Sequence, residues 1–63
     1  MSRVVDYQTG APIDGDASEA LEAASEAAAP TGAVRAERDA RGVWQPVAPA
    51  DSGPAARTVY VEP

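Results

Sequence analysis

The chain has 63 residues and a formal net charge of −5; it contains no cysteine, histidine or phenylalanine, and 15 of its 28 apolar residues are alanine. A chain this short buries only about 60% of the surface that it exposes when unfolded, and without cysteine or histidine it lacks disulfides, thiolate zinc sites, the usual general base and the strongest side-chain nucleophile. We therefore expect one small domain over residues 1–63 that is not an enzyme and binds no cofactor or metal, since every bulky apolar group is needed for packing.

A strand is predicted over residues 3–7, where Val4, Val5 and Tyr7 supply β-branched and aromatic side chains. Residues 8–12 contain glycine and proline, which is typical of a turn. The first strand is therefore short and ends before the acidic segment that follows.

The clearest predicted element is an amphipathic helix that begins at Ala17. Asp16 can cap this helix, and Glu19, three residues later, can complete a capping box. Pro30 and Gly32 end it. We expect its apolar face to pack on a sheet. That face consists of Ala17, Ala20, Leu21, Ala23, Ala24, Ala27 and Ala28, and the polar face contains Ser18, Glu19, Glu22, Ser25 and Glu26.

A β-hairpin is predicted over residues 33–38 and 43–47, which alternate in strand fashion. Its turn is Asp39-Ala40-Arg41-Gly42, where aspartate in first place and glycine in fourth fit a type I turn followed by a left-handed glycine. Pro46 lacks the donor that a central strand needs, so we expect an edge strand there or the end of strand pairing.

Residues 48–56 are rich in Pro, Ala and Gly, which predicts an exposed loop. Residues 57–62 then form a last strand, with Val59 and Val61 on one face and Tyr60 on the other. The order β-α-β-β-β predicts an α+β fold in which one amphipathic helix packs on a small mixed sheet.

The net negative charge lies before residue 31, and the predicted helix carries part of it. Glu19, Glu22 and Glu26 fall on its polar face and, with Asp14 and Asp16, form a candidate acidic surface. Such a surface can imitate a row of phosphates, or it can simply be a solvated face that keeps the protein in solution. Asp14-Gly15-Asp16 has too few ligands at the right spacing for a calcium loop.

Arg35, Arg38 and Arg41 lie close together in the predicted hairpin, near Trp44. Arginine beside an aromatic ring can bind phosphates and stack on bases. Acidic residues interleave with these arginines, however, so cross-strand ion pairs are the competing interpretation. Trp44 is either the main core residue or an exposed anchor for a partner; the shortage of large apolar groups favours burial.

Three strings, Thr31-Gly32-Ala33-Val34, Gly42-Val43-Trp44-Gln45 and Arg57-Thr58-Val59-Tyr60-Val61-Glu62, resemble small uncharacterised proteins of GC-rich actinobacteria, some of them on phages or plasmids. The resemblance covers residues 31–62 only. It implies a compact accessory protein from a mobile element, and it assigns no site residues.

We expect a protein-binding module that contacts another protein through an exposed sheet edge or through the acidic helix. Because the chain shows neither a signal sequence nor a membrane span, we expect the protein to be cytoplasmic. One alternative is an acidic mimic of nucleic acid that inhibits a DNA- or RNA-handling complex, such as a host defence system. A second alternative is direct nucleic-acid binding by the arginine-rich hairpin, which the acidic net charge disfavours. The oligomeric state stays open, a dimer through sheet edges included.

Overall fold

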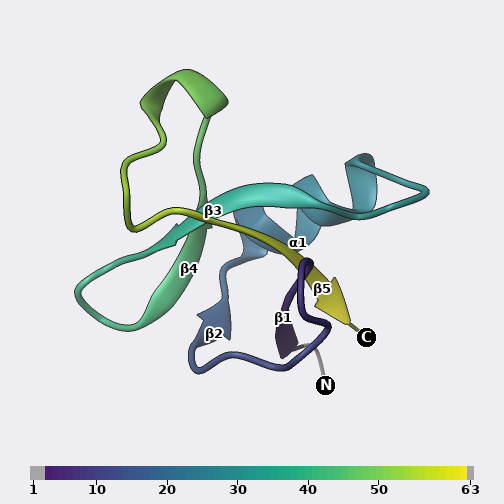
Figure 1. Ribbon diagram of the computed structural model, residues 1–63, viewed down its shortest axis with the longest axis horizontal. Coiled ribbons are helices and arrows are strands. Elements are labelled where there is room, and N and C mark those ends of the chain that lie inside the picture. Colours follow the sequence, from purple (N-terminus) through teal and green to yellow (C-terminus); the bar gives the residue numbers. More distant parts are fainter. Residues whose placement is uncertain (1–2, 63) are drawn as a thin grey trace.

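The computed structural model describes residues 3–62 and has one helix packed against a five-stranded sheet (Figure 1). The strands lie in the order β1-β5-β3-β4-β2, and all neighbours are antiparallel except β2 and β4. The predicted α+β class with a mixed sheet is therefore confirmed, and the short β2 is an addition to the predicted order. The elements are β1 (Arg3–Asp6), β2 (Asp16–Ala17), α1 (Glu19–Ala27), β3 (Val34–Arg38), β4 (Val43–Pro46), the 3-10 helix η1 (Pro49–Asp51) and β5 (Arg57–Glu62).

Residues 11–13 cover the outer edge of β1. The Asp6 N–H donates to the Ala11 carbonyl at 3.0 Å, and the Ile13 N–H donates to the Val4 carbonyl at 3.1 Å. The chain then continues into β2, which pairs with β4 at the other end of the sheet. A single segment thus joins the two edge strands, so the sheet curls around its core instead of lying flat.

Helix α1 begins two residues later than the sequence predicts. Its N-cap is Ser18, whose Oγ accepts a hydrogen bond from the Leu21 N–H at 3.0 Å. Asp16, the predicted cap, lies in β2 opposite Val43. Pairing with β4 holds Asp16 and Ala17 extended, and this long-range contact overrides the local capping box.

The buried face of α1 agrees only in part with the predicted apolar face, of which Leu21 is buried and Ala24 and Ala28 are half-buried. Leu21 and Ser25, four residues apart, are buried, whereas Ala20, Ala23 and Ala27 are exposed. Leu21 is the helix's one large apolar side chain, and burying it contributes about 2 kcal/mol. Burying an alanine methyl contributes far less. The helix therefore turns the Leu21 side toward the core, and Ser25, one turn later on the same side, is buried with it.

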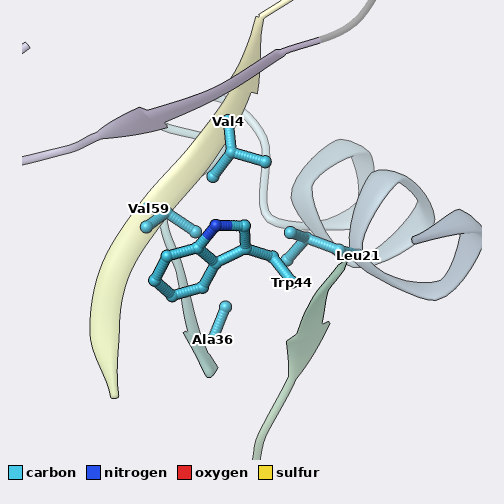
Figure 2. Close-up of a cluster of buried hydrophobic side chains, with 5 residues drawn as sticks. All are labelled: Val4, Leu21, Ala36, Trp44 and Val59. Atoms are coloured by element: carbon cyan, nitrogen blue, oxygen red, sulfur yellow. The ribbon is translucent and has the colours of Figure 1, made fainter. Parts of the chain in front are cut away.

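Trp44 lies at the centre of the core. Figure 2 shows its indole among Val4, Ala36 and Val59 of the sheet, with Leu21 of the helix beside it. The tryptophan is only 5% exposed. Of the two predicted placements, the buried one is therefore correct, and Trp44 is not a surface anchor.

The predicted hairpin is present between β3 and β4. The Gly42 N–H donates to the Asp39 carbonyl at 3.0 Å, and Gly42 has a φ of 83°, as the type I turn with a left-handed glycine requires. Pro46 pairs with Ala36 of β3, and β2 extends along β4 only as far as Trp44. The proline therefore faces no second strand, which agrees with the predicted edge position.

The last strand has the predicted bounds, with Val59 fully buried and Tyr60 on the other face. In the loop before it, residues 48–51 and 54–55 are exposed, and Ala56 is buried. No helix within residues 3–62 has the length and apolar character needed to cross a membrane.

Candidate functional site

An open groove of about 610 Å³ lies between the C-terminal half of α1 and the end of β5. We call it the α1–β5 groove. Ala29, Pro30, Tyr60 and Val61 contribute apolar surface to it, and Glu22 and Glu26 of the helix contribute carboxylates.

Ser25 ties the helix to the two strands at the base of this groove. Its Oγ donates to the Gly32 carbonyl at 2.8 Å and accepts from the Val61 N–H at 3.1 Å. Continuing the register in which Val34 faces Val59 would place Gly32 opposite Val61. The hydroxyl thus stands between the two groups that a longer β3–β5 ladder would join directly, and it fixes the position of α1 relative to β5.

The turn after the helix forms the far end of the groove. The Gly32 N–H donates to the Ala28 carbonyl at 3.2 Å, and Gly32 has a φ of 71°. A Cβ at Gly32 would lie 3.2 Å from the Ser25 Oγ. Glycine at this position lets the turn approach the helix closely, which keeps Pro30 and Thr31 beside the end of β5.

The groove is electronegative. Among the described residues, neither Glu22 nor Glu26 belongs to an ion pair, and the groove lining includes no arginine. The last turn of α1 has no basic residue either. Because the C-terminal end of a helix carries a partial negative charge, Glu26 adds to the helix dipole there instead of opposing it.

Tyr60 is the aromatic residue of the groove. The residue is half-buried, and its side chain lies on the face of β5 opposite Val59 and Val61. There its ring meets the ring of Tyr7 edge-on, with centroids 6.2 Å apart and an interplanar angle of 90°. Such T-shaped contacts are favourable, so Tyr7 holds the Tyr60 ring in place. Tyr7 itself is 45% exposed.

The structure brings together only part of the predicted acidic surface. Glu22 is half-buried and Glu26 exposed, and both line the groove, whereas Glu19 is exposed in the first helical turn outside it. Asp14 and Asp16 precede the helix, and the main-chain carbonyl of Asp14 accepts a hydrogen bond from Trp44 Nε1. Within residues 3–62, no group of three or more Asp or Glu side chains is arranged to hold a metal ion.

The three predicted arginines do not form one patch. Arg35 lies on the outer face of the sheet, where its Nη1 donates to Thr58 Oγ1 at 3.4 Å. Arg38 is on the opposite face of β3 and lines a smaller depression of about 430 Å³ beside Trp44. Arg41 is in the hairpin turn, 3.3 Å from Asp39. Alternation along β3 and the bend of the turn separate the three side chains.

The smaller depression contains charges of both signs. Arg38 and Arg57 lie in its lining with Asp14, and Arg57 Nη1 is 3.3 Å from Asp6 Oδ2. An ion pair already engages one of the two guanidinium groups, so this depression attracts an anion weakly.

Sequence reasoning identified Glu22 and Glu26 but missed Ser25 and Tyr60 as parts of a site. The available signal for Ser25 was its spacing of four residues from Leu21, which places both on one face of a helix. No local pattern connects Tyr60 with the helix, because their contact depends on how the chain folds back between them.

The chain matches no protein-family model, and neither the curated proteins nor the solved structures include one with significant similarity to it.

Proposed function

We propose that this protein is a non-enzymatic protein-binding accessory module and that it holds a segment of its partner in the α1–β5 groove. The observation that carries the proposal is apolar surface next to carboxylates without ion-pair partners among the described residues. Protein interfaces combine an apolar centre with a polar rim in this way. The mobile-element origin implied by the resemblance of residues 31–62 stays a prediction.

The groove is a better contact surface than the sheet edge. Addition of a strand from a partner requires a row of free backbone N–H and C=O groups. Residues 11–13 occupy the outer edge of β1, β2 occupies the first half of β4, and Pro46 removes a donor from the second half. The same arrangement gives little support to a dimer through sheet edges.

A nucleic-acid mimic is the second candidate function. It is supported by the exposure of Glu19 and Glu26 on one helix, with Asp14 and Asp16 exposed close before it. A nucleic-acid mimic binds its partner through the spacing of its charges, whereas binding in the α1–β5 groove also needs the apolar surface of that groove. Direct nucleic-acid binding by Arg35, Arg38 and Arg41 has less support, because their side chains lie on different parts of the surface.

Affinity capture with a groove-blocking variant tests the proposal. In Ala29→Trp the indole fills the groove from an exposed position just after α1, and Ala20→Trp is its matched control, because Ala20 is an exposed residue of α1 outside the groove. We expect the protein captured by the wild type to be lost with Ala29→Trp and kept with Ala20→Trp. Retention with both variants would refute groove binding.

The mimic makes a different prediction in the same assay. Capture would survive Ala29→Trp, disappear after joint replacement of Glu19, Glu22 and Glu26 by Gln, and be competed by duplex DNA.

A further inference from the structure

We draw no further inference here: the strongest candidate, the outer face of the sheet where the exposed ring of Tyr7 meets that of Tyr60 edge-on, carries nothing further, because nothing in the described part of the chain shows what covers it.

Discussion

The indole Nε1 of Trp44 donates a hydrogen bond of 2.9 Å to the main-chain carbonyl of Asp14, and Gly15 lies directly against the same ring. A Cβ at Gly15 would be 2.6 Å from Nε1 and 2.7 Å from the Gly42 carbonyl oxygen, and the φ of Gly15 is 121°. The segment before β2 therefore closes over the edge of the central core residue, and only glycine fits at that point.

Gly15→Ala should strongly destabilise the protein. The added methyl group overlaps the indole, and the backbone angle is unfavourable for alanine, so we expect a loss of about 3 kcal/mol in the free energy of unfolding. A chain of this length has a total stability of roughly 3–9 kcal/mol. Urea unfolding followed by Trp44 fluorescence measures the loss.

Two other glycines provide controls for that measurement. Nothing lies within 4 Å of a Cβ at Gly53 or at Gly10, and only Gly10 has a positive φ, of 74°. Gly53→Ala should be nearly neutral and Gly10→Ala should lose about 1 kcal/mol from backbone strain alone. A loss at Gly15 no larger than that at Gly10 would contradict the contact with the indole.

Ser25→Ala should cost about 2 kcal/mol, because it removes the hydroxyl from both the Gly32 carbonyl and the Val61 N–H. Ser52→Ala is the matched control, since the Ser52 hydroxyl makes one exposed bond to the Pro49 carbonyl and should contribute little. Hydrogen exchange at the Val61 amide should also become faster in Ser25→Ala. Unchanged exchange there would show that Ser25 does not bridge the two strands.

The hairpin and every strand except the two-residue β2 could be predicted because their signals are local. Asp39 and Gly42 determine the turn, and alternation around it determines the faces of β3 and β4. The rotation of α1 could not be predicted in this way, since alanine-rich sequences leave the buried face weakly defined. The burial of Leu21 in the core decides it.

The start of α1 provides a direct test of this difference between local and long-range signals. The Ser18 Oγ caps the helix, whereas Asp16 is an exposed residue of β2. We expect Ser18→Ala to lose about 1 kcal/mol and Asp16→Ala less than about 0.5 kcal/mol. If urea unfolding shows a larger loss for Asp16→Ala than for Ser18→Ala, the capping box of Asp16 and Glu19 predicted from the sequence is the correct interpretation.

The candidate site was only half predictable for a related reason. Glu22 and Glu26 could be assigned to one helical face from spacing alone. Tyr60 joins them only because β5 returns beside the helix, and Ser25 reaches the strand ends only because the helix rotates toward Leu21. Sites assembled from distant segments carry no local signature.

Asp39 should make the stability of the hairpin depend on pH. The Val43 N–H lowers the pKa of the Asp39 carboxyl below its ordinary value of 3.8, and the Arg41 N–H, the Arg41 guanidinium and Gln45 act in the same direction against a partial opposing effect of desolvation. Because the folded protein has the lower pKa, the ionised carboxylate stabilises it above the ordinary pKa, and this stabilisation is lost as the pH falls through the lowered value.

Asp39→Asn removes this titration while it keeps an oxygen that can accept from the turn. We expect the variant to be less stable than the wild type near about pH 7, and the difference to shrink at an acidic pH below the ordinary value of 3.8, as the pH falls through the lowered pKa of Asp39. Asp51→Asn, which removes a carboxylate from η1 outside the turn, should retain the wild-type dependence on pH. Urea unfolding at both pH values measures the two differences. A difference between Asp39→Asn and the wild type that stays the same at both pH values would mean that the charge of Asp39 does not stabilise the turn.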